Sequence, residues 1–166
     1  MVELEKRRTY ACSLAMPSPN NPICKEWVEE IARHVEKNKK DQIYLVGHSL
    51  GVPAILRYLE ASEAKNVKGA VLVSGPVYKT TKKKVAGFLK ESFDYKVIKT
   101  KARSFVVIHG DDDRSVSIEQ GKVLAKELNA DLVIVKKGGH LNGSAGWYSL
   151  PQALEGLNKL MRKKLR

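Results

Sequence analysis

Ile43-Tyr44-Leu45-Val46-Gly47-His48-Ser49-Leu50-Gly51 is the stretch that decides the fold class, because it joins an apolar run to a Gly-x-Ser-x-Gly motif. Ile43 to Val46 is too continuously apolar for a half-exposed strand, so we expect it to be buried on both faces in a parallel sheet. A helical pattern starts just after Ser49 and carries Ala54, Ile55, Tyr58 and Leu59. The motif therefore lies in a turn between a buried strand and a helix.

The rest of the chain alternates strand and helix patterns in the same way. Further buried strands are predicted at Ala70 to Val73, Phe105 to Ile108 and Leu132 to Val135, and Thr9 to Met16 is a candidate fifth strand. Helices are predicted from about Lys25 to Asn38, after Ser49, from about Ile118 to Leu128 and from about Leu150 onward. Gly75 to Lys101 has no strong strand signal and is expected to form a cap or loop followed by a helix.

This alternation predicts an α/β protein with a three-layer α/β/α sandwich and a mostly parallel sheet of about five strands. The 166 residues suit one domain, residues 1–166, since no repeat or linker divides them. Ligands of such sheets bind at the carboxyl ends of the strands.

The composition, with 43% hydrophobic and 29% charged residues, is that of an ordinary globular protein. No apolar run approaches the roughly 18 residues of a membrane span, and Met1 to Arg8 is too charged for a secretory signal. We therefore expect a cytoplasmic protein without a membrane partner. The net charge of +12 would suit an anionic partner. The densest lysine cluster, Lys79 with Lys82, Lys83 and Lys84, lacks interleaved aromatic residues, which favours a solvated surface over a nucleic-acid site.

The Gly-x-Ser-x-Gly motif is typical of a nucleophile elbow, in which Ser49 points its hydroxyl toward substrate. We expect a side chain at either Gly47 or Gly51 to clash in this turn. The Leu50 N–H would lie at a helix N-terminus, where it can donate to the oxyanion of a tetrahedral intermediate. The competing interpretation is a glycine-rich turn in which Ser49 only caps the helix.

An aspartate run, Asp111-Asp112-Asp113, follows the strand predicted to end at Ile108. A carboxylate at such a strand end can accept the Nδ1–H of a catalytic histidine. The chemistry alone does not choose among the three aspartates, and a divalent cation site is an open alternative.

His140 follows two glycines just beyond another predicted strand, and we prefer it as the general base. His34 in a helix and His48 in the elbow are poorer candidates, and His109 is interpreted as structural. The chain order of nucleophile, acid and histidine is that of α/β-hydrolases.

The sequence resembles the small serine hydrolases related to retinoblastoma-binding protein nine and the bacterial YdeN-type proteins. The resemblance covers nearly the whole chain and rests on the elbow, the aspartate run and four other motifs: Met16-Pro17 with Asn21-Pro22 and Trp27, Ala86-Gly87-Phe88, Phe93-Asp94-Tyr95 and Gly139-His140-Leu141-Asn142. It implies that Asp113, three residues before Val116, is the acid. The family prolines are replaced by Arg114 and Ser117, and the LxCxE motif of the animal protein is absent, so its partner binding is not transferred.

The resemblance also implies an N-terminal strand and a His-Gly loop, to which nothing before Glu3 corresponds. Three alternatives stay open: the sequence starts late, Thr9 to Met16 takes the vacant place, or a second chain supplies the strand. An open sheet edge would invite a homodimer. Because the loop supplies an oxyanion donor, whose loss costs roughly 100- to 1,000-fold in turnover, we expect a weakened enzyme.

The resulting hypothesis is hydrolysis of small acyl esters or amides through an acyl-enzyme on Ser49, Asp113 and His140, without a cofactor or metal. Five apolar residues are candidate pocket walls: Phe88, Leu89, Phe93, Trp147 and Tyr148. The alternative is a catalytically weak or inactive binding protein that keeps the hydrolase shape and uses its basic surface.

Overall fold

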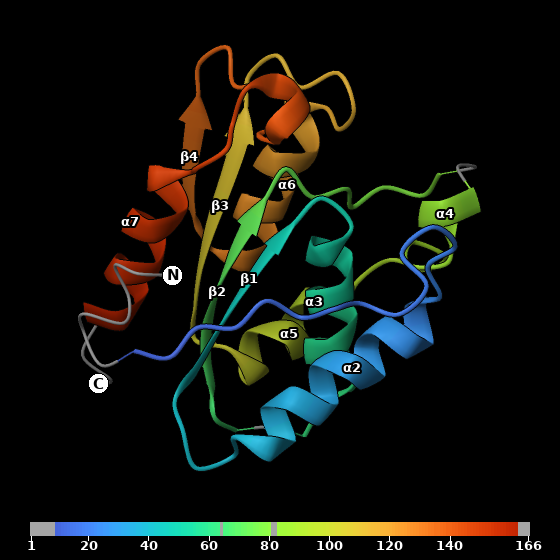
Figure 1. The fold of residues 1–166 in the computed structure, drawn as a ribbon, viewed down its shortest axis with the longest axis vertical. Helices are drawn as coiled ribbons and strands as arrows, with labels where there is room; N and C mark the ends of the chain where they lie inside the picture. The colour runs from blue at the N-terminus through green and yellow to red at the C-terminus, as the bar shows by residue number, and fades with distance from the viewer. Residues whose placement is uncertain (1–8, 64, 81–82, 163–166) are drawn as a thin grey trace.

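A computed structural model describes residues 9–63, 65–80 and 83–162 of the chain. Residues 1–8 and Lys82, which were interpreted from the sequence, lie outside these ranges. Within them, a central sheet is covered by helices on both faces (Figure 1). The predicted three-layer α/β architecture is confirmed.

The sheet has four strands in the order β1-β2-β3-β4, and all of them run parallel. They are β1 (Ile43–His48), β2 (Val67–Val73), β3 (Ser104–Gly110) and β4 (Asp131–Val135). In register, His48 pairs with Val73, and Val73 pairs with Ile108. The carboxyl ends of the strands therefore meet at one edge of the sheet, where the loops after β1, β3 and β4 leave it.

The candidate strand at residues 9–16 is not a strand, and this prediction is wrong. The segment packs through side chains instead, with Ala11 against one hydrophobic cluster and Leu14 and Met16 against the other. A strand needs a neighbour whose N–H and C=O groups can complete a ladder, and an apolar pattern does not supply one.

Strand β1 therefore forms one edge of the described sheet. The Val46 side chain on this edge strand is 53% exposed. Pairing of a second copy with this open edge stays a prediction.

One face of the sheet is covered by α2 (Cys24–Lys37), α3 (Gly51–Ala61), α5 (Tyr95–Lys101) and α6 (Ile118–Leu128). The opposite face is covered by α7 (Pro151–Arg162). A short α4 (Lys83–Ala86) and a 3₁₀ helix η1 (Gly143–Ala145) lie in the connections. None of the helices in the described ranges combines the length and the apolar character that crossing a membrane would require.

Alternation along the buried strands separates the two cores. Leu72 and Val107 face the cluster under α3 and α6, whereas Val73 and Ile108 face the cluster under α7. This division arises because successive side chains of a strand point to opposite faces of the sheet. The central strands β2 and β3 are buried on both sides, as their continuous apolar runs predict. The outer strands β1 and β4 are only partly buried, so the expectation that Ile43 to Val46 is buried on both faces is wrong.

The segment between β2 and β3 forms a loop with α4 and then α5, in agreement with the sequence prediction. Asp94 caps α5, since its carboxylate accepts the N–H groups of Lys96 and Val97. Such a cap satisfies two of the N–H groups that a helix start leaves without intrahelical partners.

Candidate active site

Ser49 lies in the turn between β1 and α3, with a positive φ of 51°. Its N–H donates to the Val73 carbonyl at 2.9 Å, which ties the turn to the end of β2. A non-glycine residue in this backbone region is strained, and surrounding packing must hold it there. This strained strand-to-helix turn has the geometry of a nucleophile elbow.

The two glycines of the motif differ in what they allow. A Cβ at Gly47 would lie 2.7 Å from Ile55 Cδ1 and 2.8 Å from the Gly51 carbonyl oxygen, so a side chain there must clash. A Cβ at Gly51 would meet nothing within 4 Å. The expectation of a clash at both positions is therefore wrong for Gly51, because its Cβ would point into open space.

The three residues named from the sequence as nucleophile, base and acid meet at the carboxyl edge of the sheet. His140 Nε2 lies 2.9 Å from Ser49 Oγ, and His140 Nδ1 lies 2.8 Å from Asp113 Oδ2. A carboxylate only accepts, so Nδ1 carries the hydrogen and Nε2 is free to accept the serine proton. The contacts join residues that lie 91 and 27 positions apart in the sequence.

Asp113 is held by the chain that follows it. Its Oδ1 accepts the N–H groups of Ser115 at 2.8 Å and Val116 at 3.0 Å, and its side chain is fully buried. Burial by itself would raise the pKa of this carboxyl, but hydrogen bonds from His140, Val116 and Ser115 hold the pKa below its ordinary value. Asp113 is therefore an ionised, oriented acceptor for His140.

The other two aspartates of the run hold the loop that carries His140. Asp111 Oδ1 accepts the Lys137 N–H at 2.7 Å, and Asp112 Oδ1 accepts the Gly139 N–H at 2.7 Å. Sequence reasoning missed these contacts. Aspartates in loops often accept hydrogen bonds from main-chain N–H groups, which was the signal in the sequence. That tendency does not identify the distant N–H group that each aspartate binds.

The structure holds His109 at a strand end, in agreement with its structural interpretation, and His34 in a helix, where it was considered a poorer candidate for the base. His109 is fully buried at the end of β3, and its Nε2 donates to the Val116 carbonyl at 2.9 Å. This bond holds the end of the loop in which Asp113 lies. His34 Nδ1 lies 3.0 Å from the Glu30 carbonyl oxygen on α2.

Leu50 immediately precedes α3, and its N–H makes no hydrogen bond to another residue of the described part of the chain. The first N–H groups of a helix have no intrahelical partner and carry the positive end of the helix dipole. This group is therefore available for an anion beside Ser49.

Three of the candidate pocket walls are core residues, which corrects the sequence-based interpretation. Phe88, Leu89 and Phe93 are 0%, 2% and 6% exposed and belong to the cluster under α2 and α3. The Phe88 ring packs edge-on against Trp27, with ring centroids 5.5 Å apart. The Arg57 guanidinium lies 4.1 Å from the Phe93 ring centroid. Their apolar surface is used inside the protein.

The other two candidate wall residues lie nearer the surface. Trp147 is half-buried against the cluster under α7, and Tyr148 is 92% exposed. Both residues follow η1 and the loop that carries His140. Trp147 is the better candidate for a substrate contact, because its side chain packs against the protein whereas Tyr148 projects into solvent.

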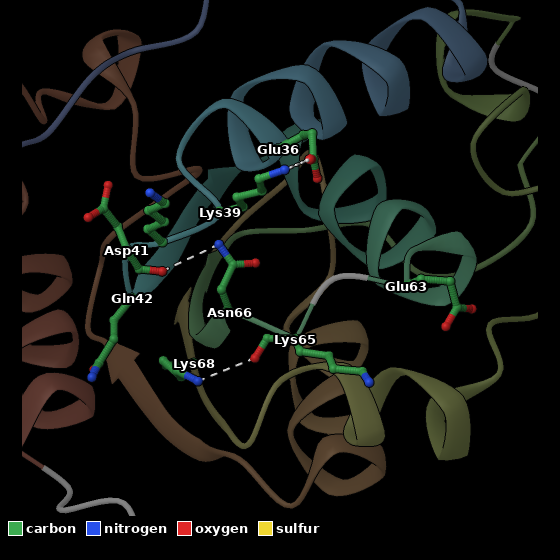
Figure 2. Close-up of a pocket in the computed structure, with 9 residues that line it drawn as sticks. Glu36, Lys39, Asp41, Gln42, Glu63, Lys65, Asn66 and Lys68 are labelled. Carbon is green, nitrogen blue, oxygen red and sulfur yellow. Dashed lines mark hydrogen bonds and ion pairs between the residues drawn. The ribbon is translucent and has the colours of Figure 1, made fainter.

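A surface hollow of about 400 Å³ lies elsewhere, and Figure 2 shows its charged lining. Its residues include Lys39, Asp41 and Lys68, near the amino ends of β1 and β2. Ser49 follows the carboxyl end of β1, and a six-residue strand separates the two ends by about 20 Å. The hollow is therefore distinct from the Ser49 site.

The cation alternative for the aspartate run has no ligand set within the described ranges. No group of three or more His, Cys, Asp and Glu side chains there could hold a metal ion. Asp111, Asp112 and Asp113 each accept main-chain N–H groups instead.

The comparison with known proteins agrees with this geometry. A family model described as serine hydrolase matches residues 2–159. The chain belongs to the serine hydrolase family. It is 35% identical over 155 residues to YdeN of Bacillus subtilis strain 168, covering 92% of this chain and 81% of YdeN. The resemblance to the YdeN-type hydrolases is thus confirmed.

Solved structures place this serine hydrolase in the α/β-hydrolase fold. The crystal structure of B. subtilis YdeN superposes with a TM-score of 0.90 and 33% identity, covering 98% of this chain and 88% of that one. A carboxylesterase structure from the thaumarchaeon Nitrososphaera gargenis superposes with a TM-score of 0.71, covering 99% of this chain and 85% of that one. Its identity is 12%, so this second likeness concerns the fold alone.

Proposed function

We propose that this serine hydrolase cleaves small acyl esters or amides through an acyl-enzyme formed on Ser49. The observation that carries the proposal is the continuous contact from Ser49 Oγ to His140 Nε2 at 2.9 Å and from His140 Nδ1 to Asp113 Oδ2 at 2.8 Å. A hydroxyl is a weak nucleophile until a base removes its proton, and this arrangement provides the base and its orienting acid.

In the first half-reaction Ser49 Oγ attacks the acyl carbonyl carbon, and its proton passes to His140 Nε2. The carbonyl oxygen becomes an oxyanion, which accepts a hydrogen bond from the Leu50 N–H. The bond to the leaving alcohol or amine then breaks, and the leaving group takes the proton from His140.

In the second half-reaction water attacks the ester carbon of the acyl-enzyme while His140 Nε2 accepts a proton from that water. Collapse of the second tetrahedral intermediate releases the carboxylic acid and returns the proton to Ser49 Oγ. Asp113 stays ionised throughout and stabilises the imidazolium that forms in each half-reaction.

The expected rate is modest. The sequence motif and the start of α3 both support the Leu50 N–H as an oxyanion donor. Removing one donor of a two-donor oxyanion hole costs roughly 100- to 1,000-fold in turnover. With Leu50 as a single donor, hydrolysis of activated esters would therefore be slow.

The working environment is also part of the proposal. Cys12 and Cys24 are both free thiols, which suits the reducing cytoplasm. The substrate is a small acyl compound, and no cofactor enters the reaction as written above.

The test combines fluorophosphonate labelling with turnover of p-nitrophenyl acetate. We expect labelling at Ser49, and we expect Ser49→Ala to abolish labelling and to lower turnover by at least about 1,000-fold. Ser18→Ala is the matched control, because Ser18 is an exposed serine with a positive φ of 46°. Labelling elsewhere, or equal turnover in Ser49→Ala, would refute the proposal.

The same experiment addresses the alternative of a non-catalytic binding protein. That alternative draws on the net charge of +12. A probe-inert protein that binds polyanions with a steep salt dependence would support it.

A further inference from the structure

His48 joins the nucleophile turn to the loop of His140. It is the last residue of β1 and directly precedes Ser49. Its Nε2 lies 2.8 Å from the main-chain carbonyl oxygen of His140, 92 positions away in the sequence. The two imidazole rings also lie against one another, with centroids 5.0 Å apart and planes inclined by 57°.

The hydrogen bond defines the protonation of His48. A carbonyl oxygen only accepts, so the hydrogen must be on Nε2. Partial burial of the imidazole disfavours its charged form and lowers the pKa of His48, and the neighbouring His140 imidazole lowers this pKa further. The bond to the His140 carbonyl and the charge of Asp113 oppose it without cancelling it. His48 is therefore a neutral Nε2–H donor near neutral pH.

The His140 loop needs external support because its backbone is strained. Lys137, Gly139 and Leu141 all have positive φ angles, of 53°, 54° and 49°. Two of the three residues are not glycine, and such conformations persist only where the surroundings hold them.

The supports of this loop come from two directions. Asp111 and Asp112 hold Lys137 and Gly139 from the loop after β3, on the side of the acid. His48 holds the His140 carbonyl from the side of the nucleophile. The His48 bond adds a main-chain link between the two residues whose side chains must meet, since His48 is covalently bonded to Ser49.

We propose that His48 is a positioning residue, which keeps His140 Nε2 within hydrogen-bond distance of Ser49 Oγ by donating to the His140 carbonyl. This inference rests on the proposed function for its catalytic consequence. The His48 hydrogen bond is made to the main chain of His140, so His48 acts through His140 and takes no proton in the reaction as written above.

Two substitutions separate the hydrogen bond from the bulk of the side chain. His48→Gln keeps an N–H donor of similar reach, whereas His48→Leu keeps apolar volume without a donor. His34→Leu is the matched control, because His34 also contacts a main-chain carbonyl but lies in α2.

The expected kinetic result is a fall of about tenfold in kcat for His48→Leu with little change in KM, because loss of the hydrogen bond would raise the barrier by about 1.4 kcal/mol. His48→Gln should recover most of that loss, and His34→Leu should match the wild type. Equal losses in the Leu and Gln variants would overturn the inference, because the donor would then be irrelevant.

A second readout does not depend on turnover. The downfield proton resonance of His140 Nδ1–H, which is bonded to Asp113, reports by its exchange with water how well His140 is held. We expect exchange about tenfold faster in His48→Leu and near the wild-type rate in His48→Gln. The melting temperatures of all three variants are measured to confirm that they remain folded.

The two readouts distinguish the two proposals. Wild-type turnover together with unchanged exchange and kcat in His48→Leu would overturn the positioning role and leave the proposed function standing. A wild-type protein without labelling or turnover, with faster exchange in His48→Leu alone, would overturn the function and support the positioning role.

Discussion

The backbone of Gly110, at the end of β3, lies directly against the backbone of Gly139, the residue before His140. A Cβ on Gly110 would overlap the Gly139 carbonyl oxygen and would lie 2.9 Å from the Gly139 nitrogen. The loops that carry Asp113 and His140 therefore approach one another so closely that only a residue without a side chain fits at position 110.

Gly110→Ala should push the two loops apart. We expect the free energy of unfolding to fall by about 1–3 kcal/mol, as in overpacked cores, and kcat to fall by at least about tenfold. Urea denaturation and p-nitrophenyl acetate turnover measure the two effects. Gly87→Ala is the matched control, because a Cβ at Gly87 would have no atom within 4 Å and should change stability and kcat very little. Gly146 is less suitable, because its φ of 84° would strain an alanine. A silent Gly110→Ala would contradict the close approach.

Asp113→Asn should reduce kcat by roughly 1,000- to 10,000-fold, because an amide favours the wrong tautomer of His140 and cannot stabilise imidazolium. Asp112→Asn is the matched control, since asparagine keeps an oxygen acceptor for the Gly139 N–H. We expect the control to lose less than about tenfold. Similar losses in both variants would argue against Asp113 as the residue that orients His140.

The depressed pKa of Asp113 predicts a specific pH dependence of stability. Because its folded-state pKa lies below the unfolded value of about 3.9, its contribution is complete above that value and is lost as the pH falls through the folded-state pKa. The stability difference between wild type and Asp113→Asn should therefore shrink from pH 6 to pH 3. Urea unfolding at both pH values tests this, and a constant difference would show that Asp113 has an ordinary pKa.

Phe88 and Trp147 should respond differently to truncation. Phe88→Ala removes a fully buried ring and should lower the free energy of unfolding by about 3–5 kcal/mol. Trp147→Ala should be milder in stability and should raise KM for aryl or alkyl esters, since Trp147 is half-buried beside the His140 loop. Denaturation curves and KM values for esters of increasing chain length show which of the two residues supports the core and which contacts the substrate. A KM effect confined to Phe88→Ala would reverse the assignment.

Periodic patterns predicted most of the fold. The apolar runs at β1, β2, β3 and β4 each lie inside the observed strand. The central strands β2 and β3 are largely buried because helices cover both of their faces, whereas the outer strands β1 and β4 are only partly buried. Residues 9–16 carried a similar pattern and formed no strand. Their pattern reports burial of the side chains, whereas a strand also requires a partner for its main-chain groups.

Residue type was a weaker guide to the site. Phe88 and Trp147 are both large and aromatic, and only packing shows that one lies in the core and the other near the surface. The run of three aspartates left the acid undecided on chemistry, and the resemblance to a family singled out Asp113. The structure separates them by direction, since Asp113 faces His140 while Asp111 and Asp112 face the main chain of the His140 loop.

The sequence by itself determined the parallel strands, the strained turn at Ser49 and the order of the three reactive residues along the chain. These features are local, because they depend on side-chain periodicity and on the backbone preferences of a few neighbouring residues. Only the tertiary structure decided that His140 reaches Ser49, that its Nδ1 faces Asp113 and that His48 holds its carbonyl. Hydrogen-bond distances between residues up to 92 positions apart depend on the packing of every strand and loop between them.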